Sequence, residues 1–408
     1  MTSTTTPHPR LLVIDDDRAM CQMLTDLASA YGYITSSAST LHEITTSIDE
    51  HHDLILLDLS LGETDGMTVM RALAEKHAGA NLVLLTGADQ AVLNGARRVA
   101  ELSGFNVVGA CPKSATITQL EGLLRERSST IDESGATSRP AEVAGGRSQY
   151  TDAALAALDA GLLHLVYQPI MSLDTGYVVG AEALLRLESP ELAGVSPELF
   201  VPAIEAAGHS VQLLDAVMKC AARDRARSVA LSALETVSIN VSVRDLADLT
   251  VPERAAEILG AAAEPKRWTL EITETAEVDR LADALDVLIR LRLKGFGLAM
   301  DDFGSGTSTL ARLREYPFTV LKADRRFADA DQNDLERTGN MFRAAVDLAA
   351  AMNLRVVAEG IETEDEFRLC GDVGCDLVQG WFVGKPVKPE AFGVLVASWN
   401  VNAERWRR

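Results

Sequence analysis

Residues 178–186 read VVGAEALLR, and seven other short apolar segments resemble this one between residues 164 and 379. Continuous apolar runs of this kind are typical of strands that are buried on both faces. The eight candidate strands are 164–169, 178–184, 237–241, 268–273, 297–301, 319–322, 355–359 and 376–379. Stretches with helical spacing separate many of them: 199–208, 212–230, 279–293 and 341–352. Eight strands with helices between them in roughly 250 residues predict a (β/α)8 barrel similar to the TIM barrel.

The N-terminal part of the chain shows the same alternation on a smaller scale. Its candidate strands are 11–14, a weaker run at 33–37, 54–57, 82–85 and 107–110, and its candidate helices include 18–30, 66–76 and 89–103. A five-unit βα pattern predicts a doubly wound parallel sheet. The whole chain is therefore expected to be an α/β protein with a (βα)5 domain followed by a barrel.

The segment between the two patterns is expected to be a flexible linker. Residues 128–150 are rich in Ser, Thr, Gly, Pro and charged side chains and have no apolar period. Such a composition cannot bury a core. The predicted domains are thus residues 9–127 and residues 151–400.

Composition argues against several kinds of partner. The net charge is −21, so the chain is expected to repel nucleic-acid backbones and anionic membranes, and we predict no DNA binding. No apolar run approaches the roughly 20 residues that span a bilayer, and residues 1–10 lack the apolar core of an export signal. Five cysteines without a CxxC pair are typical of a reducing compartment. We therefore expect a cytoplasmic protein.

Several polar residues of the first domain follow its candidate strands. Asp15 and Asp16 follow the first strand, Asp58 the third, Thr86 the fourth and Lys113 the fifth. Ligands of open parallel sheets bind at the carboxyl ends of the strands, and grouped carboxylates suit Mg²⁺. Any one of these acids has an ordinary alternative role as a helix N-cap. Their common placement at one edge of the sheet favours a site.

These residues carry a family resemblance. The segments LLVIDDD (11–17), DLILLDLSLGETDG (53–66) and LLTG (84–87), together with Lys113, resemble the receiver domain of two-component response regulators. The resemblance implies that Asp58 accepts a phosphoryl group from a histidine kinase. It also implies that Asp15 and Asp16 hold Mg²⁺ and that Thr86 and Lys113 bind the phosphoryl group.

The receiver-like segment departs from the family pattern beside Lys113. The family usually has a proline directly after this lysine, whereas Pro112 precedes it here and Ser114 follows. The switch aromatic that many members carry three residues before the lysine is replaced by Ala110. These departures put the usual signalling relay in doubt rather than the phosphorylation.

The second domain places acids and amides in or at the ends of its candidate strands. An isolated Glu in a strand is often a solvated edge residue, but a series of this kind at one barrel mouth favours a site. The residues are Glu182, Asn240, Glu271, Asp301, Asp302, Lys322, Glu359 and Gln379. Buried carboxylates need a cation, and an all-oxygen set favours Mg²⁺ or Mn²⁺. The adjacent pair Asp301 and Asp302 suits two ions.

This series resembles the EAL-type cyclic di-GMP phosphodiesterases, most closely in YQPIMSLDTGYVVGAEALLR (167–186). The resemblance implies that the metal ligands are Glu182, Asn240, Glu271, Asp301, Asp302 and Glu359. The implied catalytic residues are Lys322, Glu359, Glu182 and Gln379, and Gln168 and Arg186 would contact the nucleotide. Glu274 would anchor loop 302–310. The loop has Thr307 where tyrosine is common, and Ala323 replaces isoleucine beside Lys322.

The sequence thus predicts a response regulator that hydrolyses cyclic di-GMP to linear pGpG with metal ions, modulated by phosphorylation of Asp58. We expect a histidine kinase as partner and a homodimer or higher homo-oligomer. Two alternatives stay open: a catalytically silent cyclic di-GMP receptor, and an adaptor that recruits a protein when its receiver is phosphorylated. Metal-dependent turnover distinguishes the first hypothesis from both others.

Overall fold

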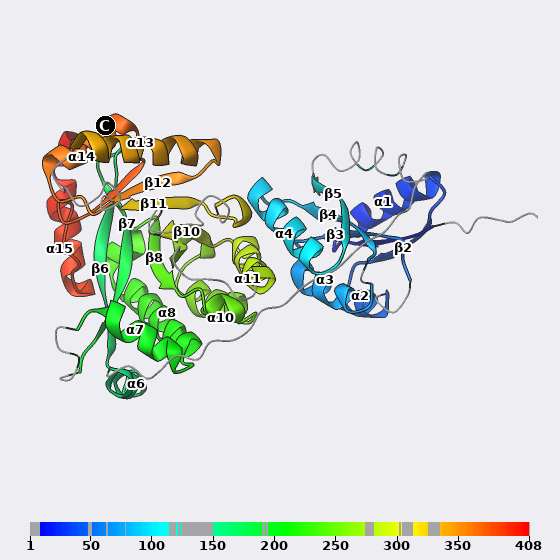
Figure 1. Cartoon of the computed structure of the whole chain (residues 1–408), viewed down its shortest axis with the longest axis horizontal. Helices are drawn as coiled ribbons and strands as arrows, with labels where there is room; N and C mark the ends of the chain where they lie inside the picture. The colour runs from blue at the N-terminus through cyan, green and yellow to red at the C-terminus, as the bar shows by residue number, and fades with distance from the viewer. Residues whose placement is uncertain are drawn as a thin grey trace, which may run out of the picture. The chain divides into compact units, whose positions relative to one another are not determined.

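The computed structural model divides into two compact units, Met1–Glu142 and Val143–Arg408 (Figure 1). The structure describes residues 9–47, 51–62, 64–77, 79–113, 120, 124, 150–189, 192, 195–273, 281–301, 303, 313–324 and 335–407, without the side chains of 336 and 337. Of the expected linker 128–150, residues 128–149 lie outside this described part.

The first unit contains the expected five-stranded parallel sheet, with strand order β2-β1-β3-β4-β5. Its strands are β1 (Arg10–Ile14), β2 (Ile34–Ala38), β3 (Leu54–Asp58), β4 (Asn81–Thr86) and β5 (Asn106–Pro112). The helices whose bounds are described are α1 (Arg18–Ala30), α2 (Leu41–Ser47), α3 (Gly66–Ala74) and α4 (Gln90–Leu102). The doubly wound α/β prediction is confirmed for this unit.

Two features of the sequence build this sheet. The central strands β3 and β4 are almost entirely buried, as continuous apolar runs require. Three aspartates start helices, because the side chains of Asp17, Asp65 and Asp89 accept hydrogen bonds from the first backbone N–H groups of α1, α3 and α4. The strand order reverses between β1 and β3, so the carboxyl ends of these two strands form the crevice where ligands bind.

The second unit is a closed barrel of eight strands, as predicted, in the order β10-β11-β12-β13-β6-β7-β8-β9. The strands are β6 (Leu163–Ser172), β7 (Val178–Leu187), β8 (Thr236–Val241), β9 (Trp268–Thr273), β10 (Gly297–Asp301), β11 (Val320–Asp324), β12 (Arg355–Glu359) and β13 (Leu377–Gln379). Each overlaps one of the candidate strands.

Helices surround the barrel. They are α6 (Thr151–Asp159), α7 (Pro197–Ala206), α8 (Ser210–Arg227), α9 (Val229–Ala233), α10 (Val251–Gly260), α11 (Leu281–Leu293), α13 (Leu335–Ala351), α14 (Glu364–Val373), α15 (Pro389–Asn400) and α16 (Ala403–Trp406). The described part of this unit also contains two short 3-10 segments, η3 (Asp245–Ala247) and η4 (Pro265–Arg267). In the part of the chain that is described, no helix combines the length and apolar character that crossing a membrane requires.

The barrel departs from regular βα alternation at its first strand. Strand β6 pairs antiparallel with both β7 and β13, while the other pairs are parallel. Only residues 173–177 connect β6 to β7, which lie side by side in Figure 1. A connection this short joins antiparallel strands, since a parallel crossover needs a dozen or more residues. The hairpin places Gln168 directly opposite Glu182.

Candidate active site

Lys322 lies at the centre of a ring of carboxylates in the barrel. Its Nζ is 2.6 Å from Glu271 Oε2, 2.8 Å from Glu359 Oε1, 3.1 Å from Asp301 Oδ1 and 3.5 Å from Glu182 Oε2. The lysine side chain is only 2% exposed. One ammonium group therefore serves four carboxylates in a region that water barely reaches.

Amide side chains extend this network from Glu182. Asn240 Nδ2 donates to Glu182 Oε1 at 2.8 Å, and Gln379 Nε2 donates to Glu182 Oε2 at 2.6 Å. The same Gln379 nitrogen lies 3.3 Å from Gln168 Oε1. With the ring around Lys322, every one of the eight barrel strands supplies one side chain to a single connected cluster.

The carboxyl groups of the cluster outnumber its one ammonium group, and their pKa values reflect this imbalance. Burial raises the pKa of Glu271 to about 8, although the Lys322 charge acts in the opposite direction. Burial likewise raises the pKa of Glu359 well above its usual range. Burial alone would lower the pKa of Lys322, but the four surrounding carboxylates, with Glu182 the strongest, together outweigh it and the pKa rises well above its usual range. Two of the carboxyl groups thus resist ionisation unless further positive charge arrives.

This donor set fits hard divalent cations. Four carboxylates face one ammonium group, and the available ligand atoms are oxygens, which Mg²⁺ and Mn²⁺ prefer. In addition, Gln379 Oε1 is buried without a hydrogen-bond partner and is open to a donor such as water. A divalent ion would favour the ionised carboxylates that burial opposes.

The cluster opens into a cleft of about 1010 Å³, which is large enough for a nucleotide ligand. Gln168 and Arg186 line this cleft, as expected for residues that contact a ligand. Arg186 Nη1 donates to the Leu185 carbonyl oxygen at 2.7 Å. Asp324 and Trp381 also line the cleft but were not singled out from the sequence. The sequence offers a signal for both residues, because each follows a predicted site residue near the end of a strand. Asp324 lies two residues after Lys322, and Trp381 lies two residues after Gln379.

Part of the expected site belongs to segments that the structure does not describe. Asp302, Glu274 and Thr307 lie outside the described residues, as does loop 302–310 apart from Phe303. Ala323, the departure beside Lys322, is 5% exposed within β11.

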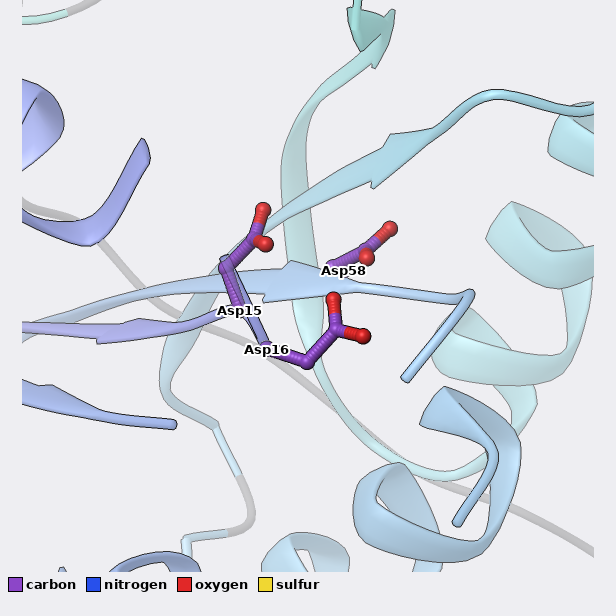
Figure 2. Close-up of side chains that lie close together, drawn as sticks. All are labelled: Asp15, Asp16 and Asp58. Carbon is purple, nitrogen blue, oxygen red and sulfur yellow. The ribbon is translucent and has the colours of Figure 1, made fainter. Parts of the chain in front are cut away.

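The first unit brings three acids together at its crevice. Ligand oxygens of Asp15, Asp16 and Asp58 all lie within 4.8 Å of one another, and Figure 2 shows the three side chains at neighbouring strand ends. Lys113 Nζ lies 2.8 Å from Asp58 Oδ2 and 3.0 Å from Asp15 Oδ2. Pro112 before the lysine therefore does not prevent it from reaching the acids.

The electrostatics of this crevice suit a phosphoryl acceptor. Burial raises the pKa of Asp58, and hydrogen bonds from Lys113 and Ser60 counteract part of that rise. Burial works against the charge on Lys113, yet its bonds to Asp58 and Asp15 raise its pKa. Thr86 is buried at the end of β4, and its Oγ1 accepts from Ala88 N at 3.0 Å. Each predicted residue of this site except Asp16, which is exposed, is at least partly buried.

These two sites match two families. The EAL domain model matches residues 151–386, more than half of the chain, and the response regulator receiver domain model matches residues 11–119. The chain belongs to the EAL domain family and carries an N-terminal receiver domain. Domains of both families generally use divalent metal ions.

Curated relatives share one or both domains. The chain is 27% identical over 343 residues to the cyclic di-GMP phosphodiesterase RocR of Pseudomonas aeruginosa, covering 84% of this chain and 86% of RocR. It is 37% identical over 228 residues to the cyclic di-GMP phosphodiesterase PA2567 of the same organism, covering 56% of this chain. The chain spans only 39% of PA2567.

Solved structures agree with the barrel. The MucR phosphodiesterase of P. aeruginosa, in complex with c-di-GMP, is 31% identical with a TM-score of 0.53, covering 60% of this chain and 99% of that chain. The EAL enzyme Bd1971, bound to cAMP and cyclic di-GMP, is 28% identical with a TM-score of 0.56, covering 61% of this chain and 68% of that chain.

Proposed function

We propose that this protein is a response regulator whose barrel hydrolyses cyclic di-GMP to linear pGpG. The observation that carries the proposal is the buried cluster around Lys322, to which each barrel strand contributes one polar side chain and which opens into a nucleotide-sized cleft. The relatives RocR and PA2567 are named as phosphodiesterases of this nucleotide, which supports the same substrate.

The reaction is the addition of water to one phosphodiester. Water attacks phosphorus, the bond to a ribose 3′ oxygen breaks, and the leaving oxygen takes a proton, so one phosphate becomes the 5′ end of pGpG. Divalent ions, when bound, supply a nucleophilic water and neutralise phosphate charge. We assign their binding to Glu182, Asn240, Glu271, Asp301, Asp302 and Glu359, and two ions suit this number of ligands.

The remaining residues position the nucleotide and the metal ligands, or stabilise the charge that develops on phosphate. Lys322 places its ammonium among the carboxylates and offsets charge that develops on phosphate. Gln379 holds Glu182 through its hydrogen bond, while Gln168 and Arg186 contact the nucleotide from the cleft wall. We also assign to Glu274 the anchoring of loop 302–310, a role that lies outside the described residues apart from Phe303. Glu182 and Glu359 complete the reaction centre.

The test is turnover of cyclic di-GMP by the full chain with Mg²⁺ or Mn²⁺, followed as pGpG by chromatography. Glu182→Ala removes a ligand, and Glu188→Ala is a matched control because Glu188 is exposed beyond the end of β7. Product from wild type and the control, but not from Glu182→Ala, supports the proposal. Tight nucleotide binding without product from wild type would instead indicate a silent receptor.

The receiver domain adds regulation to this proposal. A histidine kinase phosphorylates Asp58, with Mg²⁺ held by Asp15 and Asp16 and the phosphoryl oxygens contacted by Thr86 and Lys113. The geometry of Lys113, which bridges Asp58 and Asp15, supports this role. Residues 128–150 link the domains 9–127 and 151–400, and the working unit is a cytoplasmic homodimer or higher homo-oligomer.

A further inference from the structure

An exposed tryptophan lies at the edge of the nucleotide-sized cleft. Trp381 follows β13 and is 58% exposed, although indole rings are among the side chains that gain most from burial. Among the described residues that line the cleft, it is the only aromatic one. Its flat apolar face is therefore available to a ligand in the cleft.

The backbone on the N-terminal side of Trp381 is fixed by the active-site network. Gln379, two residues earlier, donates to Glu182 at 2.6 Å. Gly380 lies so close to the segment between β12 and α14 that an added Cβ would be 2.0 Å from the Ile361 carbonyl oxygen. This contact leaves no space for a side chain at residue 380, and it fixes the position of the backbone that leads from β13 to Trp381.

The backbone on the C-terminal side is fixed by an aromatic cluster. Phe382 packs against Phe367, Trp399 and Trp406, with ring centroids 5.3, 5.8 and 5.4 Å apart. Its N–H also donates to the Ile361 carbonyl oxygen at 3.0 Å. Trp381 is thus presented between two anchored neighbours, an arrangement that lowers the entropy cost of binding.

A lysine restrains the indole ring itself. Lys385 Nζ lies 4.6 Å from the centroid of the Trp381 ring, within the range of a cation–π contact. One face of the ring carries this cation, so the opposite face is the one left for a planar ligand.

We propose that the free face of Trp381 stacks on a guanine base of cyclic di-GMP, an inference that rests on the proposed function. In the proposed function the metal ions and Lys322 serve the phosphates of the substrate, so its guanine bases require a contact of a different kind. Base–aromatic stacking supplies such a contact and does not depend on charge. Trp381 is a substrate-binding residue that places the ribose–phosphate ring over the carboxylates.

The test compares Trp381→Ala, Trp381→Phe and Tyr177→Ala with wild type. Tyr177 is also an exposed aromatic residue, at 48%, but does not line the cleft. Affinity is measured with Mg²⁺ and a phosphorothioate analogue of cyclic di-GMP that resists hydrolysis, and kcat and KM are measured with cyclic di-GMP. Loss of stacking raises Kd and KM about 5- to 100-fold in Trp381→Ala. We expect kcat to change less than about 3-fold, because the ring does not touch the reacting phosphate.

Trp381→Phe retains a stacking surface and stays within about 3-fold of wild-type affinity. Intrinsic tryptophan fluorescence of wild type is quenched by the analogue, and Trp381→Phe loses that quench. Equal Kd for wild type and Trp381→Ala would overturn the stacking proposal while leaving the proposed function intact. A wild-type protein that neither binds the analogue nor cleaves cyclic di-GMP would overturn both.

Discussion

Gln379 and Glu182 are joined by a hydrogen bond of 2.6 Å although their strands, β13 and β7, are separated by β6. The antiparallel β6 contributes Gln168 to the same group, 3.3 Å from Gln379. The hydrogen bond therefore spans the junction where the barrel closes. It also fixes one oxygen of a carboxylate that we assign to metal binding, as residues behind metal ligands commonly do.

Gln379→Leu is expected to weaken this site without unfolding the barrel. The leucine fills similar volume but donates no hydrogen bond, so Glu182 loses its shortest partner. Metal affinity or turnover should fall about 10- to 100-fold. The half-saturating concentration of Mn²⁺ for pGpG formation is the measurement. Gln212→Leu, at an exposed position on α8, serves as control, and equal metal dependence of the two variants would contradict the assigned role.

Lys322→Met is expected to make the fold depend on metal. The substitution keeps the length of the side chain but leaves four carboxylates, three buried and one partly buried, without their ammonium group. Removing one partner of a buried ion pair costs about 3–5 kcal/mol. The melting temperature should fall in a chelator and recover more with Mg²⁺ or Mn²⁺ than that of wild type does. A melting temperature in chelator equal to that of wild type would rule out this role for Lys322.

The placement of the carboxylates was predictable from the sequence because strand ends of a barrel meet at one mouth. Glu271 and Lys322 are 51 residues apart, yet both belong to short apolar runs that could be read as strands. The direction of β6 was a different matter. Its apolar pattern is the same for a parallel and an antiparallel strand. Only the shortness of the five-residue connection 173–177 distinguishes the two directions.

Other properties of the site arise from distances that no sequence pattern encodes. The raised pKa of Glu271 reflects its burial beside Glu182 and Asp301, which come from other strands. The exposure of Trp381 depends on contacts of Gly380 with Ile361 and of Phe382 with Trp399. Each of these requires the folded backbone, so sequence reasoning selected the polar residues of the cluster and missed the aromatic residue beside them.

Asp245→Asn is expected to raise the stability of the protein relative to wild type, and to do so more at neutral pH than at acid pH. Asp245 is 2% exposed, and this burial raises its pKa from 3.8 to about 6. Hydrogen bonds from Ser210 and Ser242 counteract part of the rise in pKa. The negative charges of Glu205 and Asp248 add to the rise. A raised carboxyl pKa means that the folded state binds the proton more tightly than the unfolded state. Wild-type stability therefore falls as pH rises from about 4 to 6, by up to about 3 kcal/mol, and is constant above that range.

Asparagine does not titrate, so the stability difference between Asp245→Asn and wild type should grow over the same pH range. Urea midpoints at pH 4.5, 5.5 and 7.5 measure this difference. Asp347→Asn controls for the loss of a surface charge, because Asp347 is exposed on α13 and is not among the groups that shift the pKa of Asp245. A difference that does not change with pH would show that Asp245 is ionised throughout.

Asp58→Asn is expected to abolish phosphorylation and its effect on the barrel. Asp58 is fully buried beside Lys113, whose Nζ lies 2.8 Å from Oδ2. The amide lacks the nucleophilic carboxylate oxygen but keeps the shape of the side chain. After treatment with acetyl phosphate and Mg²⁺, wild type should show the mass of one phosphoryl group and a changed rate of pGpG formation, whereas Asp58→Asn shows neither.

Asp26→Asn is the matched control, since Asp26 is exposed on α1 and away from the crevice acids. Coupling requires that phosphorylation favours one of two states of the protein that differ in activity. If wild type takes up the phosphoryl group but pGpG forms at the same rate in all three proteins, the receiver does not control the barrel. Phosphorylation would then act through a recruited protein, as the adaptor hypothesis requires.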